Sequence, residues 1–320
     1  MSAPSYMGMG KGMSGAERLA ISAIVILASI FPVEWLPIGL QLLHGTDGQL
    51  SGKQGQVLLV RVPVQDESAQ VTGQFRGRRI PFFAEFRAGE KPGFLGLLGI
   101  DMQEEPGTHP LDVDVQIKDD HKPIQYMVAV SKEQYAVEKL TLPKGKVDLD
   151  QKGLDRYKAE QEQIRQALAE DSGARIWSSS FVEPVAGRNS GRFGSVRVLN
   201  GQPKTPHRGE DIAAPLGQDV VASNDGVVRL TVDHVFSGKG IYLDHGLGLY
   251  SMYFHLSEIN VRDGERVTAG QVIGKVGATG RATGPHLHWG TKVNGAWVNP
   301  FSLVELPISA AHGSAQSASR

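Results

Sequence analysis

The histidines are the residues of this chain whose types and spacing could do chemistry. The chain has ten of them, and seven fall between His207 and His312. In the run HRGED, His207 and Asp211 stand four residues apart around Gly209. A glycine in a loop that enters a strand lets the backbone turn, so an imidazole and a carboxylate can converge there on one ion.

Two further histidine arrangements follow later in the chain. The run HLH contains His286 and His288, and residues i and i+2 of a strand share one face, with rings roughly 6–7 Å apart. His255 is embedded in YFHLS, within an apolar and aromatic strand pattern. Both arrangements predict imidazoles that point into a common cleft.

These groups together satisfy the requirements of a hydrolytic zinc site. Such a site needs three N or O protein ligands, an open position for water and a nearby acid or base. His207, Asp211 and one histidine of the HLH pair supply the ligands, and the other HLH histidine and His255 remain for proton transfer or charge stabilisation. The chain has no cysteine, which excludes thiolate metal sites and cysteine nucleophiles.

Glycine turns and short strands position these residues. The region 180–306 alternates strand-bearing stretches with glycine turns and has no obvious long helix, which predicts an all-β domain. Ahead of it, Val57–Val64, Arg78–Phe86 and Leu111–Lys118 read as strands, the last with apolar residues on odd numbers. This spacing predicts a small antiparallel sandwich.

One amphipathic helix is predicted between these two β regions, over Gln151–Asp171. Its apolar residues repeat at helical spacing and should pack on a neighbouring element, while the charged run KAEQEQIR should face solvent. The apolar residues are Leu154, Tyr157, Ile164 and Leu168.

Length and charge narrow the class of protein. A chain of 320 residues exceeds what one core usually organises, so two domains are expected. Lys plus Arg number 33 and Asp plus Glu 34, and this balance predicts no nucleic-acid partner. The uncharged run Leu19–Phe31 would form a helix about 20 Å long, which is typical of a secretory signal and leaves an interrupted membrane anchor open.

The C-terminal region resembles a known family. The stretch HRGEDIAAPLGQDVVASNDGVV, and then GKGIYLDHGLGLYSMYFHLSEINVRDGERVTAGQVIGKVGATGRATGPHLHW, is similar to the lysostaphin/LytM-type zinc metallopeptidases over about Phe193–Leu303. The resemblance implies that His207, Asp211 and His288 are zinc ligands and that His286 and His255 are catalytic. One departure is Gly290, where many members of that family carry glutamate.

The resemblance also implies an architecture and a function. The fold class expected is mainly β, with the domains 1–45 (signal peptide or membrane anchor), 55–145 (antiparallel β-sandwich module), 146–179 (connecting helix and linker), 180–306 (LytM-type β-sheet metallopeptidase domain) and 307–320 (disordered tail). The function expected is zinc-dependent endopeptidase cleavage of peptidoglycan peptides by an exported, periplasmic enzyme. A membrane tether and a regulatory protein partner are open, as is occlusion of the cleft by the β module or the helix.

Two alternatives belong to other classes of protein. A non-catalytic LytM-like regulator of a cell-wall amidase would carry a vestigial metal site, whereas all five implied site residues are present here. A biotinyl or lipoyl carrier domain would share a hairpin like RVTAGQVIGKV. Such carriers present a lysine at an exposed turn, whereas Lys275 of this chain stands within a strand pattern. Metal binding distinguishes the first alternative from the enzyme.

Overall fold

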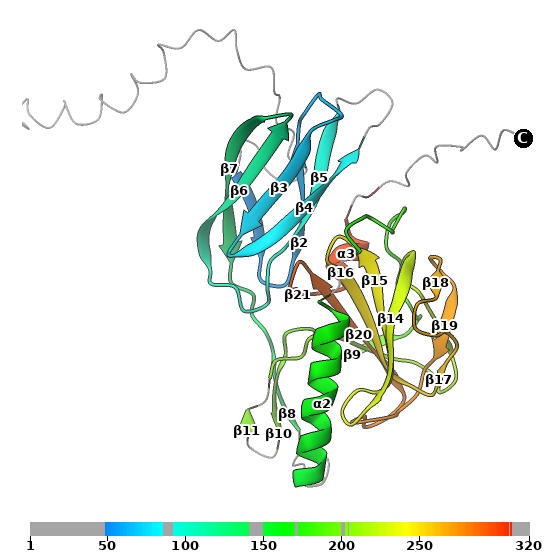
Figure 1. The fold of residues 1–320 in the computed structure, drawn as a ribbon. Coiled ribbons are helices and arrows are strands. Elements are labelled where there is room, and N and C mark those ends of the chain that lie inside the picture. Colours follow the sequence, from blue (N-terminus) through cyan, green and yellow to red (C-terminus); the bar gives the residue numbers. More distant parts are fainter. Residues whose placement is uncertain are drawn as a thin grey trace, which may run out of the picture. The chain divides into compact units, whose positions relative to one another are not determined.

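The chain is mainly β, as the sequence predicts (Figure 1). The computed structural model describes residues 49–85, 92–140, 150–169, 172–199, 202–203, 205–306 and 308, and these belong to one compact unit. The predicted leader or anchor at 1–45 and all but one residue of the predicted tail at 307–320 lie outside the described residues. Within the described ranges, no helix has the length and apolar character needed to span a bilayer.

The N-terminal module is one seven-stranded sheet in the order β1-β7-β6-β3-β4-β5-β2. Its pairs are antiparallel except β1 with β7, which run parallel. The strands are β1 (Gln49–Lys53), β2 (Val57–Val62), β3 (Gln70–Phe75), β4 (Arg78–Glu85), β5 (Gly93–Gly99), β6 (Gly107–Ile117) and β7 (Asp120–Ser131).

Strand β4 makes this sheet continuous where a sandwich of two stacked sheets was expected. Its residues up to Pro81 pair with β3, and from Phe82 onward they pair with β5. Pro81 has no amide hydrogen, so the ladder with β3 ends there and the strand changes partner. The sheet wraps around a single core to which all seven strands contribute.

Burial in this module follows the sequence pattern. The odd-numbered residues Leu111, Val113 and Val115 of β6 are buried, as alternation predicts. The continuous apolar runs of β2 and β5 are buried on both faces because their outer residues join a second core with Trp177 and Val293. The N-terminal module is therefore packed against the C-terminal domain through β2 and β5.

The predicted connecting helix is α2 (Gln151–Ala167), which begins after Asp150. The Asp150 side chain accepts a hydrogen bond from Gly153 N at 2.8 Å, as an N-cap does. The end of the helix packs on a cluster around Tyr242 and Met252 through Ile164 and Leu168.

Two details of this helix differ from the expectation. Leu154 is exposed, so it does not join the packed face. Glu160, within the run expected to face solvent, is buried and accepts hydrogen bonds from Val235 N at 3.0 and 3.2 Å. The buried backbone amide of Val235 needs a hydrogen-bond acceptor, and the spacing of apolar residues in the sequence does not reveal this requirement.

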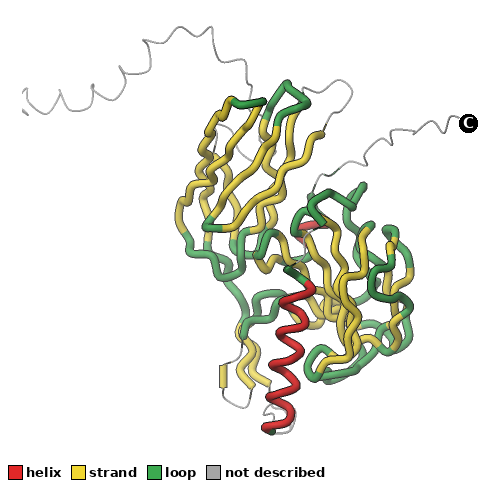
Figure 2. The backbone as a smooth tube through the Cα atoms, viewed as in Figure 1, coloured by secondary structure: helices red, strands yellow, loops and turns green. Residues whose placement is uncertain are grey.

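The C-terminal domain is built on an eight-stranded sheet in the order β18-β14-β15-β16-β20-β12-β9, with β21 paired to β20. Figure 2 shows the strands of the chain in yellow and its helices in red. Its strands are β9 (Arg188–Gly191), β12 (Gly209–Ala213), β14 (Gly226–His234), β15 (Gly238–Gly246), β16 (Leu249–Leu256), β18 (Arg266–Val267), β20 (His286–Val293) and β21 (Ala296–Val298).

Smaller elements complete the fold. They are the sheet of β13 (Asp219–Val221), β19 (Val272–Lys275) and β17 (Glu258–Ile259), the sheet of β11 (Gln202–Pro203), β10 (Val196–Leu199) and β8 (Val137–Leu140), and the short helix α3 (Phe301–Val304). The strands β8 and β10 are parallel, so the chain that leaves the N-terminal module is hydrogen-bonded to the segment that leads to His207.

Candidate active site

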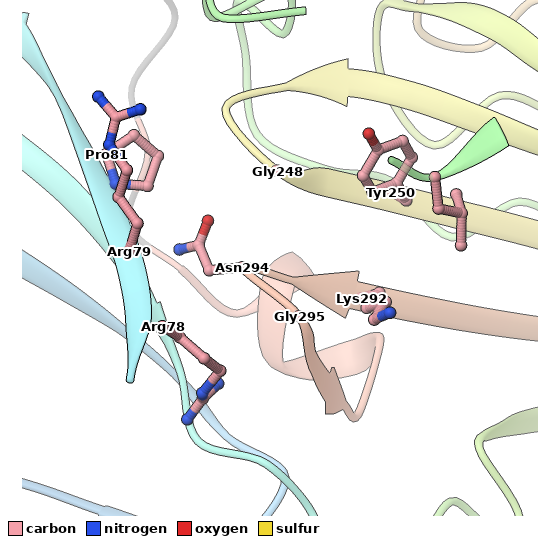
Figure 3. Close-up of a pocket in the computed structure, with 9 residues that line it drawn as sticks. Arg78, Arg79, Pro81, Gly248, Tyr250, Lys292, Asn294 and Gly295 are labelled. Carbon is pink, nitrogen blue, oxygen red and sulfur yellow. The ribbon is translucent and has the colours of Figure 1, made fainter. Parts of the chain in front are cut away.

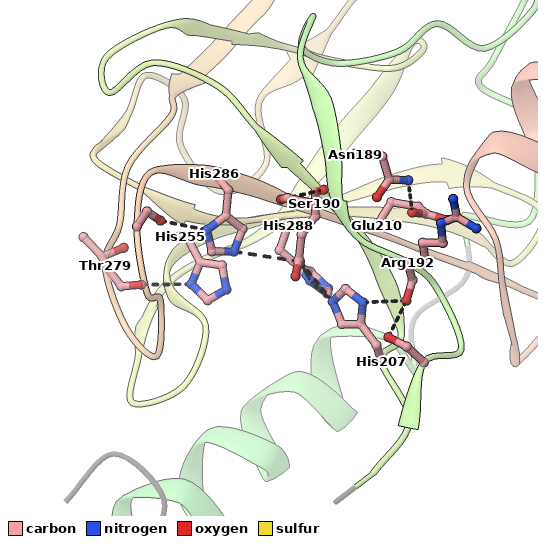
Figure 4. A network of polar contacts seen from close by, with 12 residues as sticks. Asn189, Ser190, Arg192, His207, Glu210, His255, Thr279, His286 and His288 are labelled. Carbon is pink, nitrogen blue, oxygen red and sulfur yellow. Dashed lines mark hydrogen bonds and ion pairs between the residues drawn. The ribbon is translucent and has the colours of Figure 1, made fainter. Parts of the chain in front are cut away.

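The candidate metal ligands meet where β12 and β20 run side by side. The antiparallel register places Asp211 directly opposite His288. Asp211 Oδ1 lies 2.8 Å from His288 Nδ1 and 2.9 Å from His207 Nε2, and the two imidazole nitrogens are 2.9 Å apart (Figure 4). Two nitrogens and one carboxylate oxygen aimed at one point form the donor set of a catalytic zinc site, so these residues fit the metal that the sequence implies.

A backbone carbonyl fixes the orientation of His207. Its Nδ1 lies 3.0 Å from the carbonyl oxygen of Arg192, and its main chain is paired with Gly194 and Ser195. Nδ1–H donates to that carbonyl, which leaves the lone pair of Nε2 directed at Asp211 and His288. A second partner of this kind sets the tautomer of a metal-binding histidine.

Gly209 is important because its lack of a side chain leaves room for the imidazole of His288. An added Cβ would lie 2.5 Å from the carbonyl oxygen of Trp289 and 2.6 Å from His288 Nε2. The sequence suggested that this glycine lets the backbone turn, but its φ is not in the left-handed region. Its role is to let the imidazole of His288 lie flat against β12.

The carboxyl group of Asp211 is held in its ionised form. Burial opposes ionisation, but the close contacts of the carboxylate with the imidazoles of His207 and His288 outweigh it and hold the pKa of Asp211 well below its usual range. Asp211 is therefore an anionic ligand over the physiological pH range.

The other two histidines lie beside the ligands. His286 Nδ1 is 2.8 Å from the carbonyl oxygen of Gly284, and its Nε2 is 3.8 Å from Asp211 Oδ1. The ring of His255 lies 4.7 Å from that of His286, and its Nδ1 is 2.8 Å from the carbonyl oxygen of Thr279. All five residues that the sequence singled out are thus brought to one place.

His255 has an unusual backbone and an unusual environment. Its φ is +64°, a left-handed conformation that non-glycine residues rarely adopt and that tends to occur at functional sites. Burial, followed by the neighbouring rings of His288 and His286, lowers the pKa of His255 to about 3. Its imidazole is therefore neutral at rest, with Nδ1 donating to Thr279 and Nε2 carrying the lone pair.

Several groups that orient the site residues could not be predicted from the sequence. The three carbonyls that orient the imidazoles belong to Arg192, Thr279 and Gly284, and Phe254 stacks on His288 with ring centroids 5.6 Å apart. Backbone carbonyls carry no residue signature. The stacking follows from the register of β16 on β20, which pairs Phe254 with His288.

The remaining histidines near the site have other roles. His245 is fully buried, with Nδ1 2.7 Å from the carbonyl oxygen of Asp225 and Nε2 2.7 Å from Ser251 Oγ. His234 is buried under α2, with its Nε2 3.2 Å from Gln163 Oε1. Neither joins the ligand cluster.

A cleft of about 320 Å³ opens over the cluster. Its floor is the face of β16 and β20 that carries the site, and one wall is α2. The lining includes His207, His255, His288, Tyr157, Glu160 and Arg281. The cluster is therefore accessible from a groove that the connecting helix narrows.

Comparisons with known proteins agree with this geometry. Residues 205–300 match the model of peptidase family M23. The chain is 44% identical over 141 residues to the peptidoglycan DD-endopeptidase ShyC of Vibrio cholerae, covering 43% of this chain and 32% of the relative. It is 46% identical over 97 residues to the DD-carboxypeptidase/endopeptidase Mpg of Neisseria meningitidis, covering 30% of this chain and 22% of the relative.

A solved structure extends the likeness beyond the site. A protein from Pseudomonas aeruginosa, described as a candidate M23 peptidase, aligns with a TM-score of 0.59 and 29% identity over 77% of this chain and 93% of that one. The chain spans a third or less of the length of the two enzymes named above. On the motifs, the site and these matches, residues 205–300 form a domain of peptidase family M23.

Proposed function

We propose that this protein is a zinc-dependent endopeptidase that hydrolyses peptide cross-links or stem peptides of bacterial peptidoglycan. The observation that carries the proposal is the convergence of His207, Asp211 and His288 within 4.8 Å, with His286 and His255 beside them. Two imidazoles and one carboxylate are typical of catalytic zinc. The substrate class follows the relatives, which are named as peptidoglycan DD-endopeptidases and a DD-carboxypeptidase/endopeptidase.

The metal would supply Lewis-acid chemistry when bound, lowering the pKa of a water ligand to about 7. His207, Asp211 and His288 would hold it. His286 is assigned the role of proton acceptor because Nδ1–H donates to Gly284, which leaves Nε2 free to accept a proton beside the ligands.

His255 is the second imidazole of the reaction. It is neutral at rest, and its ring lies 4.7 Å from that of His286. We assign it the stabilisation of the reacting carbonyl or the delivery of a proton to the leaving amine. The carbonyl of Thr279 holds its ring in place through either step.

The uncharged run Leu19–Phe31 supports export to the periplasm, either with a cleaved signal or with a retained membrane anchor.

We also propose that the hydrolytic activity is restrained, because α2 partly occludes the cleft until a partner or the substrate displaces the helix. The support is that Tyr157 and Glu160 of α2 line the cleft and contact the 233–236 turn.

The proposal is tested by digesting purified peptidoglycan and identifying released muropeptides by mass spectrometry. The wild-type protein should convert cross-linked dimers to monomers, and His288→Ala, with a melting temperature measured in parallel, should not. If the wild-type protein binds no zinc and leaves dimers intact, the non-catalytic regulator becomes the better account.

A further inference from the structure

A pair of cations lies near the metal ligands: Arg208 lines the cleft, and Lys292 lies beside it. Residues 286, 288, 290 and 292 alternate onto one face of β20, so Lys292 follows His288 on the same face. At about 3.3 Å per residue, Lys292 lies about 13 Å from His288 along the strand. Arg208, which directly precedes β12, reaches the same area because Gly209 pairs with Gly290.

Trp297 holds both cations in place. The guanidinium carbon of Arg208 lies 5.1 Å from the centroid of the indole ring, and Lys292 Nζ lies 5.7 Å from it. Trp297 pairs with Lys292 across β20 and β21 and also lines the cleft over the metal ligands. Contacts of this kind hold the cationic groups of both side chains against the ring.

The charge of this pair is not compensated within the described residues. Neither Arg208 nor Lys292 forms an ion pair with a described carboxylate. Asp101, the acid that acts on Lys292, already accepts hydrogen bonds from Trp297 N at 2.8 Å and Gln103 N at 2.9 Å. Burial, and then the charge of Arg208, lowers the pKa of Lys292, and the charge of Asp101 opposes this only in part.

Among the residues that line the cleft, Glu160 is the one acid, and it is buried and paired with Arg156 at 2.8 Å. Gly290 stands between His288 and Lys292 without a side chain, so the cleft floor is open there. Lys292 lines a separate cavity of about 260 Å³ together with Arg79 and with Arg78, which is paired with Glu104 (Figure 3). An extended peptide that lies on this floor meets a positive surface about two to four residues from the ligands.

We propose that Arg208 and Lys292, held against Trp297, form a carboxylate-binding subsite for the peptide substrate. This inference rests on the proposed function, and it names the feature of the substrate that the cleft selects. Stem peptides carry free carboxylates both on side groups and at their C-terminus, and a guanidinium binds either through paired hydrogen bonds. The subsite favours anionic stems over amidated ones.

The test compares three synthetic cross-linked stem dimers: one with all carboxylates free, one with the side carboxylates amidated and one with the terminal carboxylate amidated. We expect the wild-type zinc enzyme to lose about 10- to 100-fold in kcat/KM on one amidated dimer, the range for one charge-assisted hydrogen bond. The dimer that loses rate identifies the carboxylate.

Variants of the protein show which residues cause the preference for dimers with free carboxylates. Arg208→Gln should cut the free and amidated dimers alike, Arg208→Lys should keep part of the preference, and Lys292→Gln should weaken it. Arg262→Gln, which removes an exposed charge outside the cleft lining, is the control and should behave as wild type. Zinc content and melting temperature of each variant show that it is folded.

Two results would overturn the subsite. In one, wild type cuts all three dimers equally; in the other, Arg208→Gln and Lys292→Gln keep the full preference. If wild type cuts no dimer at all, the proposed function fails, and the subsite fails with it. Failure of the subsite alone is different, because wild type then still cuts the dimers.

Discussion

Replacing Gly209 by alanine should damage the metal site without touching a ligand. The added methyl group would meet the carbonyl oxygen of Trp289 at 2.5 Å and His288 Nε2 at 2.6 Å. Real Cβ atoms essentially never come closer than 3.0 Å to such atoms. The methyl group can be accommodated only if β12 separates from β20 or if the ring of His288 turns away, and each change moves a ligand.

The size of the effect follows from that overlap. Restoring an ordinary contact of 3.4 Å requires a shift of about 0.8 Å at His288 and about 0.9 Å at the carbonyl oxygen of Trp289. A displacement of about 1 Å at a catalytic group costs on the order of 100-fold in rate. Loss of a supporting contact typically costs a metal site 10- to 100-fold in affinity. Gly209→Ala should therefore bind zinc at least tenfold more weakly and lose about 100-fold in kcat/KM.

Two other glycines give a graded control. Gly284 has open space where a Cβ would stand, although it is two residues from His286, so Gly284→Ala should behave as wild type. Gly290→Ala would place its methyl group 3.2 Å from the carbonyl oxygen of Arg208. Its effect on zinc affinity and rate should lie between the effects of Gly209→Ala and Gly284→Ala. Zinc affinity by competition with a chelating dye, together with hydrolysis rates, ranks the three. Wild-type zinc affinity in Gly209→Ala would refute the steric reasoning.

The remaining predictions concern the metal, the helix and a buried histidine. Removal of metal by a chelator should abolish hydrolysis and lower the melting temperature, and one equivalent of zinc should restore both; activity that survives chelation would contradict the site. The double variant Tyr157→Ala/Glu160→Ala removes two contacts that hold α2 beside the cleft, so hydrolysis should rise up to about tenfold, and an unchanged rate would remove the case for occlusion. Burial lowers the pKa of His245 from 6.5 to about 4, so the stability from keeping it neutral is present above pH 6.5 and is lost as the pH falls towards 4, by about 3 kcal/mol. Chemical denaturation at pH 7 and pH 4.5 should therefore show a smaller drop for His245→Gln than for wild type, and equal drops would contradict this.

A shorter protein is a poor test of occlusion. Val57 N donates to Ser302 Oγ at 2.8 Å, and Asn299 N donates to the carbonyl oxygen of Gly55 at 2.7 Å. The outer face of β2 and β5 shares a core with Trp177 and Leu303. Deleting the N-terminal module would expose that core to water, so substitutions on α2 separate regulation from folding more cleanly.

Much of the site could be predicted from spacing. A residue and its second neighbour on a strand share a face, so HLH already placed His286 and His288 together. Alternation in β6 likewise indicated which of its residues are buried. These are local rules, and each concerns residues within a few positions of one another.

The rest depended on contacts between segments far apart in the chain. The register that sets Asp211 opposite His288 joins residues 77 positions apart, and no local pattern encodes it. The burial of Glu160 depends on an amide of Val235 that needs a partner. The change of partner at Pro81 could have been read as a break in β4, but whether the sheet then continues or splits is decided by the whole core.

The central claim is that three residues hold a catalytic zinc ion while a fourth acts on protons, and metal content tests it most directly. Zinc should be measured in purified wild type, His288→Ala and His286→Ala after identical dialysis. The account predicts about one equivalent in wild type, little in His288→Ala and about one equivalent in His286→Ala, which should be inactive all the same. A wild-type protein without zinc, or a His288→Ala protein that keeps it, would contradict the account.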